Sequence, residues 1–152
     1  MSKRKIVGLR SVTLIPPHSA PFKNKKSKGA RQAGIIFERR FGDYLSACFD
    51  NVLVGPWFRY EDENGSGLCQ PDMVLLEPLV IFECKLKYKA RAGLWDLRDL
   101  YQPIVEHFYE SPAKLVQVCK HLTPSARTKK ILQTLDELTT DFDYGVYQWR
   151  MP

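Results

Sequence analysis

The sequence predicts an α/β fold: a central mixed β-sheet flanked by helices, in the order α-β-β-β-α-β, followed by one further helix and strand. Two observations lead to this prediction. Short apolar runs bounded by turn residues indicate strands, and segments with an apolar residue every three or four positions indicate helices. The 152 residues fit one domain, and the 44% hydrophobic and 26% charged content is ordinary for a globular protein.

The N-terminal part of the chain is strongly basic. Residues 1–40 contain eleven Lys or Arg and a single acid, Glu38, whereas the rest contains twelve basic and sixteen acidic residues. Such a block favours a polyanionic partner such as DNA, although a solubilising tail or a nuclear-type address would have the same composition. We expect residues 1–28 to form a basic extended arm, in which residues 6–15 form a short strand or pack on the domain of residues 29–152. The candidate nucleic-acid-binding residues are Lys23, Lys25, Lys26, Lys28, Arg31 and Lys87.

Residues 29–48 are predicted to form the first helix, because their apolar residues recur at helical spacing. Glu38 lies at the margin of this apolar stripe, so its side chain could face the rest of the domain. The alternative is a solvated residue that pairs with Arg31 or Arg39. The stripe consists of Ala30, Gly34, Phe37, Phe41, Leu45 and Cys48.

Three strands should follow. Residues 51–60 indicate a strand that Gly55-Pro56 interrupts, as expected at an edge or a bulge, and residues 61–67 indicate a polar turn. Two apolar runs, Met73–Leu76 and Leu79–Phe82, indicate core strands joined at Glu77-Pro78.

The remaining elements follow the same patterns. A helix is predicted over residues 94–108, with a kink or a new segment at Pro103. Residues 114–122 should form a strand, residues 125–138 a helix capped by Ser125, and residues 144–149 an edge strand.

The hairpin of residues 71–85 contains ionisable groups among its apolar residues. If its turn centres on Glu77-Pro78, Asp72 faces Glu83, with Cβ atoms about 5 Å apart. Two such charges repel by about 4 kcal/mol at an effective dielectric constant near 20. A hard divalent cation, above all Mg²⁺, would convert this repulsion into binding. Strand alternation puts Lys85 on the face of Glu83, whereas a register slip of one residue would separate the three groups.

Pro71-Asp72 and Glu83-Cys84-Lys85 resemble the signature of the PD-(D/E)XK nuclease superfamily in order, spacing and strand context, and the resemblance extends over about residues 29–120. The size of the chain, its basic leader and the position of Glu38 are most similar to the phage-type Holliday-junction resolvases. The resemblance implies that Asp72, Glu83 and the backbone carbonyl of Cys84 bind Mg²⁺, for which Mn²⁺ could substitute. It also implies that Lys85 positions or activates the attacking water and that Glu38 completes the metal shell or helps to hold a second ion.

The implied function is a Mg²⁺-dependent endonuclease that acts on branched DNA. A homodimer is expected, since symmetric cleavage of two strands requires two sites. Three alternatives remain open: another nuclease of the superfamily, such as a duplex endonuclease or an exonuclease; a non-catalytic DNA-binding module of the same fold; and an interaction protein whose basic arm meets an acidic partner.

Other functional classes lack their signatures. The four cysteines are widely spaced and form no Cys-x-x-Cys pair, which argues against a zinc site. The sequence contains neither a phosphate-binding Gly-Lys-Ser/Thr loop nor a Gly-x-Ser-x-Gly motif. No apolar run approaches the ~20 residues of a membrane span, and no secretory signal is evident, so we expect a cytoplasmic protein without a membrane partner.

Overall fold

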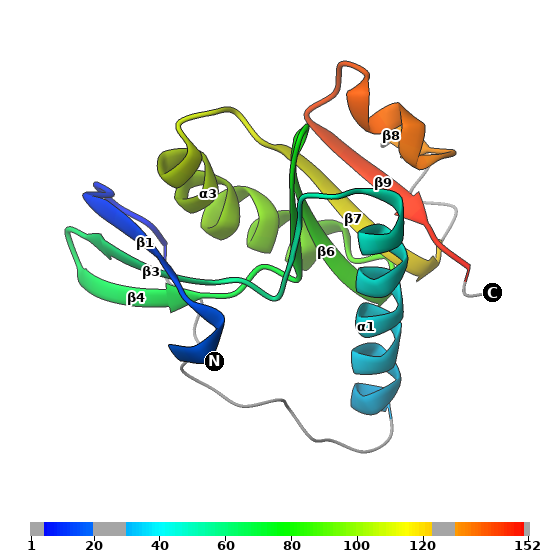
Figure 1. The fold of residues 1–152 in the computed structure, drawn as a ribbon, viewed down its shortest axis with the longest axis horizontal. Coiled ribbons are helices and arrows are strands. Elements are labelled where there is room, and N and C mark those ends of the chain that lie inside the picture. The colour runs from blue at the N-terminus through cyan, green and yellow to red at the C-terminus, as the bar shows by residue number, and fades with distance from the viewer. Residues whose placement is uncertain (1–4, 20–29, 123–129, 151–152) are drawn as a thin grey trace.

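The computed structural model describes residues 5–19, 30–122 and 130–150, and it has an α/β fold with a mixed sheet flanked by helices (Figure 1). Within these ranges the strands form a large sheet in the order β2-β5-β6-β7-β9-β8 and a small sheet in the order β1-β3-β4. The strands of the large sheet are β2 (Val52–Val54), β5 (Met73–Leu76), β6 (Leu79–Lys87), β7 (Lys114–His121), β8 (Lys130–Leu132) and β9 (Tyr144–Gln148).

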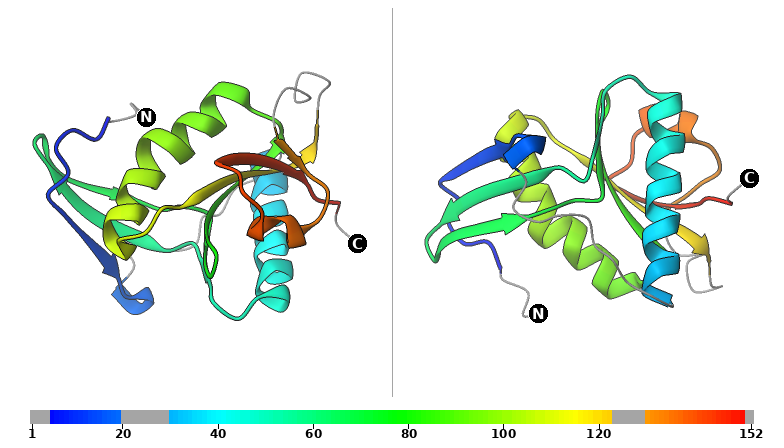
Figure 2. Two further views of the ribbon diagram at one scale, coloured as in Figure 1. Left: turned by 90° about the horizontal axis from the view of Figure 1, so that it is seen from above. Right: turned by 60° about the horizontal axis from the view of Figure 1, so that its bottom comes forward.

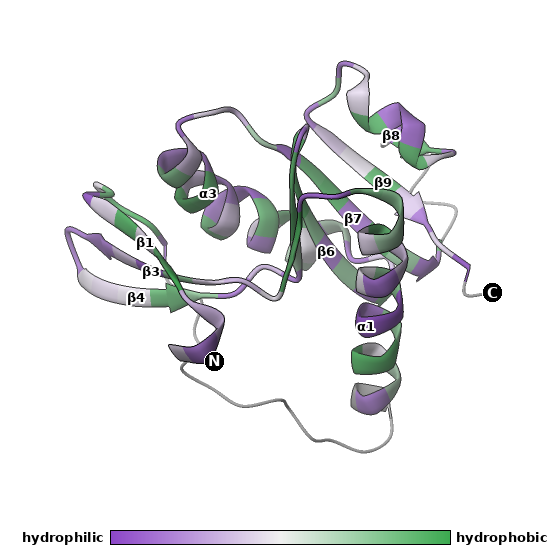
Figure 3. Cartoon of the chain, viewed as in Figure 1, coloured by the Kyte–Doolittle hydropathy of each residue, from purple (hydrophilic) through white to green (hydrophobic). Residues whose placement is uncertain are grey.

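The large sheet is antiparallel from β2 through β5 to β6 and parallel from β6 through β7 and β9 to β8. Hydrophobic residues predominate in its central strand β6 and alternate with hydrophilic ones in β7 (Figure 3). Helix α1 (Ala30–Cys48) covers one face. The connection from β6 to β7 covers the other face, and it consists of α2 (Ala90–Leu94), η2 (Trp95–Tyr101) and α3 (Gln102–Tyr109).

Helix α1 packs on the sheet through the middle of the apolar stripe predicted from its sequence, whereas Cys48 at the end of that stripe is exposed. Phe37, Phe41 and Leu45 are buried, and the ring centroid of Phe41 lies 5.7 Å from that of Phe82 on β6. Burying a side chain of this size stabilises the fold by about 1.5–3 kcal/mol. The predicted first helix is therefore confirmed, and its packing fixes the position of Glu38 beside the hairpin.

The crossover connection runs as one continuous helix (Figure 2). Its middle segment, η2, has π-helical hydrogen bonding. The Gln102 backbone N–H donates to the Leu97 carbonyl, five residues back, which is the spacing of π-helical bonding. The bonding changes from π-helical to α-helical at Gln102, immediately before Pro103, and the backbone remains helical across this point, so α3 does not start a separate helix. The strand predicted over residues 114–122 corresponds to β7.

The predicted strand of residues 51–60 is divided between two sheets. Its first part is β2, whereas its second part is β3 (Trp57–Asp62), which pairs with β4 (Gly65–Cys69) in the small sheet. Gly55 has φ = 58°, a left-handed conformation that glycine adopts without a steric penalty, and Pro56 cannot donate a ladder hydrogen bond. The chain consequently changes sheet at Gly55-Pro56 instead of forming a bulge.

Part of the predicted basic arm belongs to the small sheet. Strand β1 (Ser11–Ile15) pairs antiparallel with β3, and a 3₁₀ turn, η1 (Pro17–Ser19), follows it. The buried carboxylate of Asp62 accepts hydrogen bonds from the backbone N–H groups of Val7 at 3.1 Å and Asn64 at 2.9 Å. The expected short strand is thus present and packs on the domain, while the boundary at residue 28 stays a prediction.

The predicted helix of residues 125–138 is wrong over its described part. Residues 130–132 form β8, and Leu135–Thr139 form the 3₁₀ helix η4, which a capping box of Thr134 and Glu137 begins. Strand β9 is confirmed, but it lies between β7 and β8 and is not an edge strand. The apolar residues of this region are spaced as in a helix although they belong to a strand and a 3₁₀ helix.

Among the described residues, no helix combines the length and apolarity required to cross a membrane.

Candidate functional site

The hairpin of β5 and β6 has the predicted register. Met73 pairs with Phe82, Val74 with Ile81, Leu75 with Val80 and Leu76 with Leu79, and the Glu77-Pro78 turn contains a cis peptide bond. In every pair the residue numbers add to 155, so Asp72 stands opposite Glu83, one step beyond the end of the ladder.

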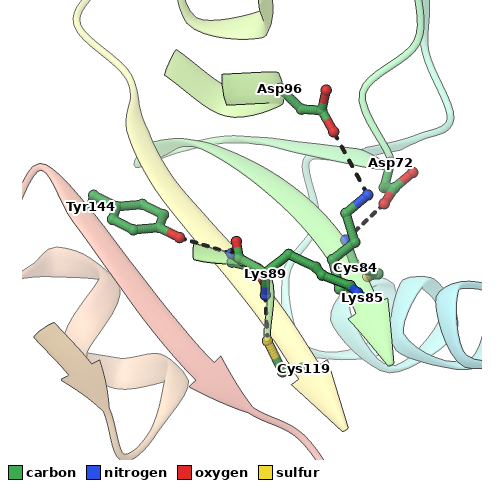
Figure 4. Close-up of polar contacts among 8 residues, drawn as sticks. Asp72, Cys84, Lys85, Lys89, Asp96, Cys119 and Tyr144 are labelled. Atoms are coloured by element: carbon green, nitrogen blue, oxygen red, sulfur yellow. Dashed lines mark hydrogen bonds and ion pairs between the residues drawn. The ribbon is translucent and has the colours of Figure 1, made fainter. Parts of the chain in front are cut away.

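The backbone around Asp72 brings these two side chains together. The carbonyl oxygen of Asp72 accepts a hydrogen bond from Gly55 N at 2.8 Å, on the side of β2, so its main chain is turned away from β6. Facing residues of this non-hydrogen-bonded kind have the closest side chains in an antiparallel pair. The Asp72 Oδ2 atom accepts the Cys84 backbone N–H at 2.7 Å. Figure 4 marks this bond with a dashed line.

Burial makes the charged form of both facing carboxyl groups unfavourable. Burial raises the pKa of Asp72 well above its usual range, and the negative charge of Glu83 raises it further, while the Cys84 N–H acts in the opposite direction. The pKa of Glu83 is also raised, chiefly by burial, although a hydrogen bond with Asp72 and the charge of Lys85 oppose this shift. The pair therefore favours holding a shared proton or a cation between its oxygens.

Glu38 of α1 joins this pair. It is half-buried, directly after the buried Phe37, and its side chain hydrogen-bonds with Asp72. Its charge also contributes to the raised pKa of Glu83, after the larger effect of burial. Helix α1 and the hairpin thus place the three carboxylates singled out in the sequence near one another.

Lys85 lies near the same carboxylates, on the face of β6 that Glu83 occupies. Burial acts to lower the pKa of Lys85, but the charges of Glu83, Asp96 and Asp72 outweigh burial and raise it. Its Nζ atom lies 3.6 Å from Asp96 Oδ2 of the π-helical segment η2 (Figure 4). The lysine therefore interacts both with the carboxylates of the hairpin and with that of η2.

Asp96 and Tyr101 were missed by the sequence analysis. Burial raises the pKa of Tyr101, and the charges of Glu83, Asp72 and Asp96 add to the shift, which places its hydroxyl in the field of the site. Positions five apart are separated by about 140° around an α-helix, and the wider π-helical turn brings residues 96 and 101 closer to the same side. No pattern in the sequence distinguishes this π-helix from an α-helix, so the signal that could have revealed the two residues is absent.

Cys84 contributes through its backbone. Its side chain packs on the α1 side of the sheet, and burial raises the pKa of its thiol well above the usual range. A neutral thiol is a poor ligand for a hard cation, so only the carbonyl of Cys84 can join the two carboxylates as a donor.

The candidate DNA-binding residues are described only in part. Lys87 is exposed at the end of β6. Arg31 lies within α1, but its side chain is outside the described part of the structure. The four lysines predicted to bind nucleic acid between positions 23 and 28 also fall outside the described residues.

The donor types at this site, two carboxylates and a backbone carbonyl, are those that magnesium takes. Within residues 5–19, 30–122 and 130–150, no group of three or more His, Cys, Asp or Glu side chains has an arrangement that could hold a metal. Mg²⁺ does not require one, since it is commonly bound by one or two carboxylates together with water and substrate phosphate. Asp72 and Glu83 supply two carboxylates, and a cation between them would offset their repulsion.

Comparisons with known proteins add no further information about this site. No protein-family model matches the chain, and no curated protein or solved structure matches it. The case for a functional site consequently depends on the position and chemistry of these residues.

Proposed function

We propose that the protein is a Mg²⁺-dependent DNA endonuclease with a restriction-endonuclease-like core of the PD-(D/E)XK type, selective for branched DNA. The observation that carries the proposal is the apposition of Asp72 and Glu83 at the end of the β5–β6 ladder, with Lys85 on the same face and Glu38 beside them. Glu83 is buried and Asp72, Lys85 and Glu38 are half-buried, and ionisable groups in such positions cost stability. This cost is expected where the groups perform chemistry.

Each residue has a chemical role in this proposal. Asp72, Glu83 and the Cys84 carbonyl would hold Mg²⁺, which when bound lowers the pKa of water and offsets charge on a phosphate. Glu38, through its hydrogen bond with Asp72, would orient that carboxylate or extend the donor set. The Lys85 ammonium would hold the attacking water or stabilise the charge that develops on the phosphate oxygens.

DNA binding would come from the basic residues. Lysines of the basic arm, residues 1–28, and Lys87 would contact phosphates, which gives affinity and orientation without reading the base sequence. Cleavage of two opposed strands at a branch would require two such sites, so the proposed active form is a twofold homodimer.

Single substitutions test the proposed chemistry. Asp72→Ala, Glu83→Ala and Lys85→Ala should each abolish Mg²⁺-dependent cleavage of a labelled four-way junction. Glu77→Ala, at the exposed turn of the same hairpin, and Lys89→Ala, whose side chain is exposed, are controls that should cleave like the wild type. Retention of metal-dependent cleavage by all three site variants would refute the assignment.

A panel of substrates tests the proposed selectivity. We expect faster cleavage of the four-way junction than of linear duplex or single-stranded DNA, and no cleavage in EDTA. Release of mononucleotides from DNA ends would identify an exonuclease instead. Binding in EDTA without any metal-dependent product would identify a non-catalytic DNA-binding module.

A further inference from the structure

Lys85 contacts a carboxylate that belongs neither to the hairpin nor to α1. Its Nζ atom lies 3.6 Å from Asp96 Oδ2, and the two side chains are only 30% and 15% exposed. An ion pair at such a half-buried position is less screened by solvent than one on an open surface. The position of the Lys85 ammonium therefore depends on where Asp96 is held.

The segment that carries Asp96 is attached to the sheet at two points. It precedes Leu97, which is fully buried between η2 and the sheet. At the start of this helical connection, the fully buried Gln117 accepts the Lys89 N–H at 2.7 Å and donates to the Lys89 carbonyl at 2.9 Å. Gln117 is the partner of Glu83 in the β6–β7 register, so one ladder fixes both Glu83 and the beginning of the segment that carries Asp96.

The Lys85 ammonium is attracted by the Asp72–Glu83 pair as well as by Asp96. Asp72 and Glu83 also attract the ammonium, and an ammonium held between them would occupy the position at which they are proposed to bind a cation. The ion pair with Asp96, a residue of another element, competes with this attraction for the ammonium. The end of a long, flexible lysine side chain requires such an anchor to keep one orientation.

We propose that Asp96 is a positioning residue that holds the Lys85 ammonium at the rim of the Asp72–Glu83 pair, where it can face the scissile phosphate. This inference rests on the proposed nuclease function and names an additional residue on which turnover depends. Asp96 acts through Lys85 and is not itself assigned a contact with DNA.

Kinetics of matched variants test the proposal. Asp96→Asn preserves the shape of the side chain and removes its charge, and it should lower kcat on junction DNA by about 10- to 100-fold while leaving KM within about twofold. Asp96→Glu should recover part of the loss. Asp99→Asn removes the same charge from an exposed position of the same segment and should behave like the wild type.

A spectroscopic measurement examines the contact without activity. Reductive ¹³C-methylation of the metal-free protein gives each lysine an NMR signal, and the signal of Lys85 is the one that Lys85→Arg removes. Asp96→Asn should shift this signal, whereas Asp99→Asn should leave it in place. Thermal unfolding of each variant in EDTA separates a loss of contact from a loss of fold.

The outcomes are distinguishable. If Asp96→Asn matches Asp99→Asn in kcat and in the Lys85 signal, while Asp72→Ala is inactive, the inference is overturned and the nuclease proposal stands. A change in KM alone would assign Asp96 to DNA binding and would also overturn it. Absence of metal-dependent cleavage by the wild type would overturn the nuclease proposal and this inference together.

Discussion

At the scale of single residues, Asp72 combines opposing requirements. Folding favours its neutral form, because burial and the neighbouring Glu83 raise its pKa, while the proposed metal requires its charged form. Its Oδ2 atom nevertheless has a fixed orientation, since it accepts the Cys84 N–H. The chain thus retains an acid that weakens the metal-free fold, as expected of a residue kept for its chemistry.

Asp72→Asn should stabilise the metal-free protein and abolish cleavage. The amide oxygen can still accept the Cys84 N–H, and the repulsion with Glu83 is removed. The melting temperature in EDTA should rise by about 2–4 °C for each kcal/mol recovered. Glu77→Gln, on the exposed turn of the same hairpin, is the control and should leave the melting temperature unchanged.

The stabilisation by Asp72→Asn should depend on pH. The raised pKa means that the folded wild type retains the proton of Asp72 to a higher pH than the unfolded chain does. The difference between variant and wild type should be absent below the usual aspartate pKa and should grow as the pH rises toward the raised value. A lower melting temperature of the variant in EDTA at neutral pH would contradict this account.

Glu38→Gln should weaken the response to metal more than the fold. Loss of its charge disturbs the carboxylate that Glu38 orients, and groups that orient metal ligands are typically worth 10- to 100-fold in metal affinity. The Mg²⁺ concentration for half-maximal cleavage should therefore rise by about 10-fold or more. Asp43→Asn, at an exposed position of the same helix, should have no effect. Equal Mg²⁺ titrations for the two variants would remove Glu38 from the site.

At the scale of elements, the pairing of two neighbouring strands could be predicted from the sequence. The type of secondary structure formed by residues 130–138 and by η2 could not. The β5–β6 register followed from a two-residue turn, since strands that close to each other in the chain have few alternative pairings. The predicted helix was wrong over residues 130–138 because Ile131, Leu135 and Leu138 have helical spacing. In the structure they belong to a strand and a 3₁₀ helix. The π-helix of η2 escaped prediction for a related reason: its residues have ordinary helical propensities.

The contact between Gly93 of α2 and Gln117 of β7 gives a prediction at this scale. A Cβ atom on Gly93 would overlap the amide nitrogen of Gln117 and lie 2.8 Å from its Cδ, so Gly93→Ala must displace this buried side chain from its bonds with Lys89 and Tyr144. Loss of buried hydrogen bonds of this kind costs about 1–3 kcal/mol, measurable by urea unfolding.

Gly34→Ala is the matched control for Gly93→Ala. Gly34 also lies in a helix, but a Cβ atom there would meet nothing within 4 Å. The substitution should stabilise the protein by about 1 kcal/mol through helix propensity. If both alanine variants were equally stable, the proposed role of Gln117 in fixing the crossover connection would be wrong.

At the scale of the whole molecule, the mixed sheet flanked by helices could be predicted from apolar periodicity. The small sheet could not, because β1 pairs with β3 across more than 40 residues and no local signal selects that partner. The distribution of charge is a property of the chain that needs no fold to predict. Residues 1–40 carry ten more positive than negative charges, whereas the remainder carries four more negative than positive.

This division of charge predicts how DNA binding responds to salt. Each phosphate that a lysine neutralises adds about 0.9 to the slope of log affinity against log salt concentration. Lys25→Gln combined with Lys26→Gln should therefore lower the affinity for a four-way junction and reduce the slope by up to about 1.8, as measured by fluorescence anisotropy in EDTA. The control is Arg98→Gln combined with Arg150→Gln, which removes the same charge from exposed positions outside the leader. An equal change of slope in both double variants would show that net charge, and not the leader, governs the interaction with DNA.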